Sequence, residues 1–113
     1  MRRRATQRDV QFDVVDGRLV RTVTFPDGRS YVQCCTQAVY ESVAHAIDEN
    51  AGQGATVDVL RAALPAPFTQ VNVALEFLKE RGCAVTRFRK SYPASDFLFE
   101  DAMAEYFALS EGG

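Results

Sequence analysis

The side chains of this sequence that are best suited to chemistry are three cysteines, Cys34, Cys35 and Cys83, and a single histidine, His45. Thiolate and imidazole groups bind zinc, so these four residues could form a three-cysteine, one-histidine site. No cysteine pair has the Cys-x-x-Cys spacing typical of such sites. Buried thiols that pack as small hydrophobic groups are therefore the favoured interpretation, and we expect no metal and no cofactor. Oxidation of a thiol is an alternative, because thiol reactivity depends on exposure and pKa.

Carboxylates that could act as a catalytic pair occur only as sequence neighbours, Asp48 with Glu49 and Glu100 with Asp101. Neighbouring residues of a helix point about 100° apart, so adjacency in a helix indicates solvent-exposed acids, not a pair that shares a proton. The sequence has no glycine-rich phosphate loop and no local signature of a nucleophile and its base. We therefore expect no enzyme and no small-molecule substrate.

Charge is distributed unevenly along the chain. The net charge of −2 is unfavourable for nucleic-acid binding, because cations that neutralise phosphates supply most non-specific affinity. Residues 1–30 contain seven arginines and four aspartates, whereas the chain from Asp96 onward contains five acids and no base. A polyanion would therefore meet the N-terminal arginines and the cations near residue 90, and would avoid the C-terminal segment.

The length of 113 residues, with 47% hydrophobic and 25% charged residues, fits one compact domain. We expect this domain to span residues 10–113, after a basic, flexible arm over residues 1–9. The apolar runs are too short for a membrane span or a secretory signal. The expected location is therefore the cytoplasm, with no membrane partner.

The first part of the domain has the alternation typical of strands. Val10, Phe12 and Val14 alternate with polar residues, and an Asp-Gly pair suited to a tight turn follows. A second strand is predicted over Arg18 to Phe25 and, after a Pro-Asp-Gly turn, a third over Tyr31 to Cys35. Together they predict a three-stranded antiparallel meander over residues 10–35.

Three helices should follow. Apolar residues at helical spacing predict a helix from a Thr36 cap to about Asn50 and a second from a Thr56 cap to the proline at position 65. A third helix is expected from about Phe68 to Arg81, because a glycine follows it. The Pro-Ala-Pro segment between the last two helices is short and stiff, which fixes the angle between them.

A hairpin and a closing helix complete the predicted fold. The hairpin strands are expected at residues 83–90 and 96–100, with the turn at residues 91–95, which include a proline. A short amphipathic helix is expected from Asp101 to Leu109.

The phrase from Thr56 to Lys90, a helix, a proline turn, a helix with Leu75, Leu78 and Gly82, and then a strand, resembles the core of the winged-helix superfamily. The resemblance covers about residues 37–100. It implies an α+β fold in which a meander at 10–35 precedes a winged-helix-like part at 36–109. Members are mostly DNA-binding transcriptional regulators, whose third helix enters the major groove and whose wing contacts the backbone or minor groove. A minority bind proteins or form dimers.

By position, the resemblance implies candidate DNA contacts on the third helix, the wing and the N-terminal arm. The amides of the third helix could read adenine edges, and the cations could contact phosphates. These candidates are Thr69, Gln70, Asn72, Lys79, Arg87, Arg89, Lys90, Arg2, Arg3 and Arg4.

Helical geometry argues against an exposed recognition face. At about 100° per residue, Val73 and Phe77 lie opposite the core side of the third helix, and Glu76 is near them. Two explanations remain open. The meander or the closing helix covers this side within the monomer, or the side belongs to a partner or homodimer interface. The candidates for such an interface are Val73, Phe77, Met103, Tyr106 and Phe107.

Overall fold

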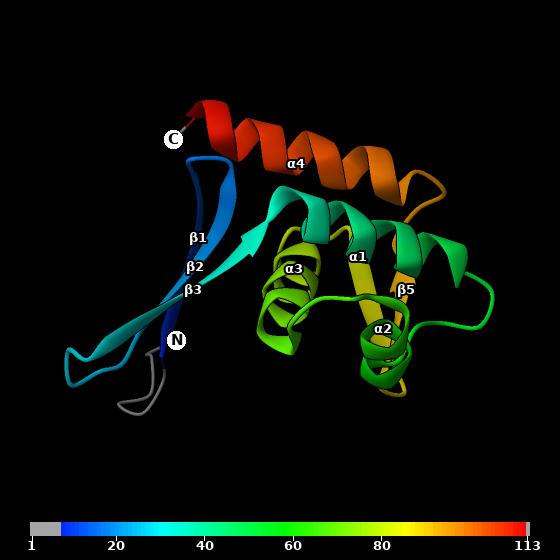
Figure 1. Ribbon diagram of the computed structural model, residues 1–113, viewed down its shortest axis with the longest axis horizontal. Coiled ribbons are helices and arrows are strands. Elements are labelled where there is room, and N and C mark those ends of the chain that lie inside the picture. The colour runs from blue at the N-terminus through cyan, green and yellow to red at the C-terminus, as the bar shows by residue number, and fades with distance from the viewer. Residues whose placement is uncertain (1–7, 113) are drawn as a thin grey trace, which may run out of the picture.

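The computed structural model describes residues 8–112 and has a mixed α and β fold. Within those residues it contains four helices, one three-stranded sheet and one two-stranded sheet, both antiparallel (Figure 1). In chain order the elements are β1 (Asp9–Val15), β2 (Arg18–Thr24), β3 (Ser30–Thr36), α1 (Gln37–Glu49), α2 (Val57–Ala63), α3 (Phe68–Glu80), β4 (Ala84–Arg87), β5 (Lys90–Pro93) and α4 (Leu98–Gly112). Residues 1–7 of the expected arm lie outside the described part, and Asp9 already belongs to β1.

The antiparallel meander is confirmed, with the strand order β1-β2-β3. Asp16 and Gly17 form the two-residue turn between β1 and β2, with φ angles of 52° and 74°. Successive strand residues point to opposite faces of a sheet, so Phe12, Leu19 and Cys35 share the face that packs on the hydrophobic core.

The strand β3 continues into α1 without a loop. Thr36, the last residue of β3, is also the cap of α1, since its side chain accepts a hydrogen bond from the backbone N–H of Val39 at 3.2 Å. The same residue donates its own backbone N–H to Oε1 of Gln70 on α3, at 3.1 Å. One residue therefore joins the sheet to two helices.

The second and third helices lie close to their predicted positions. Thr56 caps α2 by accepting the N–H of Val59 at 3.0 Å. The helix α3 begins after Pro67 and is followed by Gly82, whose φ of 76° ends it. The sequence predictions for both helices are confirmed.

The hairpin differs from the prediction. Its strands β4 and β5 are joined at Phe88 and Arg89, so the turn lies before residues 91–95 and the segment Asp96 to Glu100 is not a strand. Leu98 and Phe99 of the apolar triplet instead start α4, because Leu98 and Ala102 stand four residues apart and are both buried, and Phe97 lies in the turn before the helix. The closing helix is correspondingly longer than expected.

The hairpin is tied to the segment between α1 and α2. Ala55 and Ser91 exchange two backbone hydrogen bonds of 2.8 Å. Gly54 next to them has a φ of 82°, and a Cβ there would lie 2.6 Å from the Tyr92 ring. A glycine is required at position 54 because any side chain would collide with β5.

Aromatic rings link the sheet, α1, α3 and α4 at the centre of the molecule. The Phe77 ring lies 5.2 Å from Phe12 and 5.7 Å from Tyr40, and the Tyr40 ring stacks on Tyr106 at 5.4 Å. The Tyr40 hydroxyl donates to the Ala102 carbonyl at 2.6 Å. The helix α3 is therefore packed between the sheet on one side and α1 on the other.

Across residues 8–112, no helix combines the length and the apolar character needed to cross a bilayer.

Candidate functional site

The outer side of α3 is closed by the meander. Val73 and Phe77, on that side of the helix, have 0% exposure, and Phe12 of β1 packs edge-on against Phe77. The two residues are therefore covered by the meander of the same chain, which was the first of the two explanations offered by the sequence. Their assignment to a partner interface was wrong, because both side chains are part of the core of this chain.

A buried arginine fastens the sheet to α3. Arg21 of β2 is only 3% exposed, and its guanidinium donates to Oε1 of Gln33 at 2.8 Å and to Oε1 of Glu76 at 3.2 Å. Its Nε is buried without a hydrogen-bond partner. No role was predicted for Arg21, although its position between Leu19 and Val23 on the apolar face of a strand was a usable signal.

Both amides proposed to read bases are engaged within the molecule. Gln70 accepts the N–H of Thr36, and Nδ2 of Asn72 donates to Oε2 of Glu76 at 2.7 Å. The Glu76 carboxylate therefore accepts hydrogen bonds from Asn72 of its own helix and from Arg21 of the sheet.

The accessible side of α3 is a narrow polar strip with two acids and one base. Apart from the exposed Phe68 and the half-buried Gln70 in the first turn, the exposed or half-buried residues of α3 are Thr69, Asn72, Glu76, Lys79 and Glu80. Two carboxylates on a surface of this size oppose the approach of a phosphate backbone. The structure thus leaves α3 little surface with which to contact DNA.

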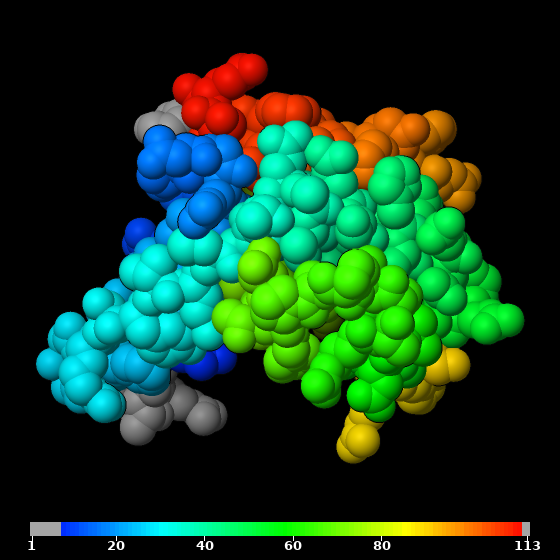
Figure 2. Space-filling model, viewed as in Figure 1, coloured from blue at the N-terminus to red at the C-terminus, as the bar shows by residue number. Residues whose placement is uncertain are grey.

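The wing candidates lie together at the end of the β4–β5 hairpin. We call Arg87, Phe88, Arg89 and Lys90 the hairpin tip. The Phe88 side chain is 97% exposed, and Arg87 and Arg89 are exposed on either side of it. In Figure 2 the hairpin, in yellow, projects at the lower edge of the molecule beyond α2. The tip presents one aromatic ring among three cations.

The backbone at the hairpin tip is strained. Phe88 and Arg89 have φ angles of 51° and 66°, although neither is a glycine, asparagine or aspartate. The β1–β2 hairpin uses the same two-residue turn with Asp16 and Gly17, the residue types that this conformation favours. Phe88 was not predicted to lie in a turn, because the pair Phe-Arg is not a turn signal.

A groove runs beside the hairpin tip. It has a volume of about 460 Å³ and is bounded by the start of α2, the last turns of α3 and the hairpin. Its lining residues are Thr56, Val57, Asp58, Lys79, Thr86 and Arg89. Val57 is 39% exposed here, so the groove combines an aliphatic side chain with charges of both signs.

Comparisons of this chain with protein-family models, with curated proteins and with solved structures found no match.

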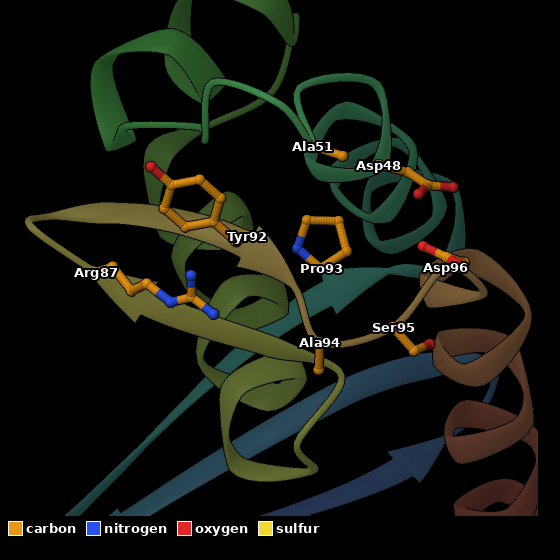
Figure 3. A pocket seen from close by; sticks show the side chains of 8 residues that line it. All are labelled: Asp48, Ala51, Arg87, Tyr92, Pro93, Ala94, Ser95 and Asp96. Atoms are coloured by element: carbon orange, nitrogen blue, oxygen red, sulfur yellow. The ribbon is translucent and has the colours of Figure 1, made fainter.

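A second, polar pocket of about 350 Å³ lies on another side of the hairpin (Figure 3). Asp48 and Asp96 are on one side of it and Arg87 is on the other. The Arg87 guanidinium lies 5.6 Å from the centre of the Tyr92 ring, which orients it along the hairpin. Among residues 8–112 there is no group of three or more His, Cys, Asp or Glu side chains that could hold a metal ion.

The C-terminal candidates differ in accessibility. Tyr106 is 2% exposed and its hydroxyl donates to the Gly17 carbonyl at 2.6 Å, so it is a core residue and not part of an interface. Met103 is half-buried against the core, and Phe107 is 47% exposed. Of the proposed interface residues, Phe107 is therefore the one whose side chain is exposed.

The cysteines and the histidine occupy separate environments. Cys34 is exposed on β3, whereas Cys35 and Cys83 are buried. Burial raises the pKa of the Cys35 thiol to about 12, and burial with the nearby Glu105 raises the pKa of Cys83. His45 stacks on Phe99 of α4 at 3.9 Å. The candidate arginines Arg2, Arg3 and Arg4 lie outside the described residues.

Proposed function

We propose that this chain is a small winged-helix-like module that binds another protein through its hairpin tip. The arrangement of α1, α2, α3 and the hairpin supports the resemblance. So do the bonds between Ala55 and Ser91, which hold the hairpin beside the helices as one unit. The α+β class is common to many folds, so the winged-helix assignment is part of the proposal.

The proposal rests on two properties of Phe88, the exposure of its side chain and its positive φ angle. A phenylalanine that is 97% exposed gains nothing from burial in the monomer, and its positive φ adds a cost of about 1 kcal/mol. Aromatic side chains and arginine are enriched at protein interfaces, where a few such residues supply most of the binding energy. An exposed ring beside Arg87 and Arg89 has this composition. The expected partner surface is an apolar pocket with an acidic rim.

Duplex DNA is the second candidate, favoured by the three cations of the hairpin tip. The hairpin tip would make the main contact, because Gln70 and Asn72 are engaged within the molecule and one side of α3 is buried. Three phosphate contacts would give a slope of about −3 in a plot of log affinity against log salt. Fluorescence anisotropy over a salt series measures that slope, and the double variant Arg87→Glu, Arg89→Glu should abolish it.

Site-specific photo-crosslinking tests the protein-binding proposal. A benzophenone amino acid at position 88 should form a discrete adduct with another protein chain, and the same residue at position 32 is the control. Val32 is 58% exposed on β3, away from the hairpin. The adduct at position 88 should disappear when Arg87 and Arg89 are changed to glutamate. An equal yield from positions 88 and 32, or an adduct indifferent to the charge reversal, would refute the proposal.

A further inference from the structure

We infer that the partner of the hairpin tip is a second copy of this chain, and that the tip docks on the outward face of α4. This inference rests on the proposed function and names its partner. The first half of the contact is the tip itself, a ring flanked by Arg87, Arg89 and Lys90 with no acid among them. Such a surface requires a partner with an apolar centre and a negative rim.

The outward face of α4 has that composition. At about 100° per residue, it lies opposite the buried stripe of Leu98, Ala102 and Tyr106. The residues of this face are Glu100, Ala104, Phe107, Ala108 and Glu111, and all of them are exposed. Two small alanines beside Phe107 leave room for an incoming ring, and a glutamate stands near each end.

The two glutamates are available for contacts with a partner. Within the described residues, no ion pair engages Glu100 or Glu111, whereas Glu105 on the flank of α4 pairs with Arg81 at 3.6 Å. The chain from Asp96 onward carries no base that would neutralise them. The outward face of α4 is therefore the acidic counterpart of the tip.

These two surfaces cannot meet within one molecule. The hairpin tip and α4 lie at opposite edges of the fold (Figure 1), and Ala55 fixes the hairpin by its bonds to Ser91. In a dimer with twofold symmetry each tip would reach the α4 of the other copy, which makes two identical contacts. Each contact is small, so the dimer should be weak and sensitive to salt.

The strained turn supplies an independent reason to assign a binding role to the tip. Asn-Gly at positions 88 and 89 would satisfy the positive φ angles that Phe-Arg opposes. If only the stability of the hairpin mattered, residue types that favour positive φ, such as the Asp-Gly pair at positions 16 and 17, would be expected in this turn. The double variant Phe88→Asn, Arg89→Gly should therefore melt at a higher temperature than the wild type and form no dimer. Its raised melting temperature shows that a loss of dimer is not a loss of fold.

Charge exchange between two variants tests the pairing of the surfaces. The tip variant carries Arg87→Glu and Arg89→Glu, and the helix variant carries Glu100→Lys and Glu111→Lys. Light scattering should give the wild type at high concentration and low salt a mass approaching twice 12.5 kDa. Each variant alone should dimerise at least about tenfold more weakly, because both contacts become repulsive.

Mixing the two variants should restore a one-to-one dimer. In that mixture each tip faces a helix of opposite charge, so both contacts are attractive again. Glu49→Lys, at an exposed position that ends α1, is the matched control and should leave the wild-type dimer unchanged. A restored heterodimer would establish that the tip and α4 touch.

The inference and the proposed function fail in different ways. A strict monomer at every concentration, a dimer indifferent to both charge reversals, or a mixture that stays monomeric overturns the inference. If the benzophenone at position 88 then links the chain to a different protein, the proposed function survives with another partner. If it links to nothing, both are wrong, and salt-dependent DNA binding would favour the second candidate.

Discussion

The hydroxyl of Tyr106 donates a hydrogen bond of 2.6 Å to the carbonyl of Gly17, a residue 89 positions earlier in the chain. The ring of Tyr106 stacks on Tyr40, so the same side chain contacts the core helix α1 and the turn of the first hairpin. The C-terminal helix therefore secures the N-terminal sheet as well as the helices beneath it.

Removing that hydroxyl should weaken the fold moderately. Tyr106→Phe keeps the stacked ring and leaves the Gly17 carbonyl without its donor, so we expect a loss of about 1 kcal/mol in the free energy of unfolding. Urea denaturation measures this loss. Tyr31→Phe, which removes the hydroxyl of an exposed tyrosine on β3, is the matched control and should change stability by less than about 0.5 kcal/mol.

Replacing Glu76 should destabilise the protein more than replacing Arg21, its partner in the ion pair, because Arg21 is the buried residue of the two. Glu76→Gln leaves the buried guanidinium without its counter-charge, and should cost about 1–3 kcal/mol because Glu76 itself is half-exposed. Arg21→Met removes the buried charge and retains most of the volume, and should cost less. Adding Glu76→Gln to Arg21→Met should then have little further effect. Equal losses from both single variants would contradict this account of the pair.

Two neighbouring glycines should respond differently to alanine. Gly54→Ala places a Cβ 2.6 Å from the Tyr92 ring at a φ of 82°, so it should destabilise the protein by more than about 1 kcal/mol. Gly52→Ala meets no atom within 4 Å and has no positive φ, so its effect should be small. Thermal unfolding of the two variants compares them directly. If both behaved alike, the close approach of β5 to Gly54 would be in doubt.

The three thiols should react at two very different rates. Cys34 is exposed, and Cys35 and Cys83 are buried, so a thiol reagent should titrate one group quickly in the folded protein and two more only after denaturation. Cys34→Ser should abolish the fast phase alone. A fast phase of two thiols would mean that one of the buried sites opens readily.

Alkaline pH should destabilise the fold through Cys35. The folded state holds this thiol protonated because its pKa is raised from 9.0 to about 12. The unfolded chain releases the proton first, so the stabilisation is complete below pH 9 and is lost as the pH rises toward 12. The slope within that window is about 1.4 kcal/mol per pH unit. Denaturation between pH 9 and 10 should be less pH-dependent in Cys35→Ala than in the wild type, and an equal slope in the two proteins would contradict this prediction.

Local patterns in the sequence predicted most of the elements. Thr36 and Thr56 cap their helices as expected, because a side-chain oxygen before an apolar helical pattern needs no distant partner. The hairpin was misplaced for the opposite reason. Phe88 and Arg89 have no preference for a turn, and their positive φ angles are imposed by the pairing of β4 with β5. A sequence read residue by residue could not show this.

The accessibility of the candidate site depended on tertiary structure. The angular positions of Val73 and Phe77 argued against an exposed recognition face, but left cover within the monomer and a partner interface both open. That the meander covers it follows only from the contacts Phe12–Phe77 and Arg21–Glu76, in which the two residues lie more than fifty positions apart in the chain. The isolation of Phe88 at the tip was invisible to periodicity, because one exposed residue does not form a pattern.

Because β3 ends at Thr36 and α1 begins at Gln37, no flexible linker separates the sheet from the helices. Because Thr36 ends the strand, caps the helix and bonds to Gln70, inserting one residue beside it would turn α1 by about 100° relative to the sheet. The meander and the helical part should therefore tumble as one rigid body in solution. A change in the angle between the meander and the helices would require breaking the Thr36–Gln70 hydrogen bond or unwinding the first turn of α1.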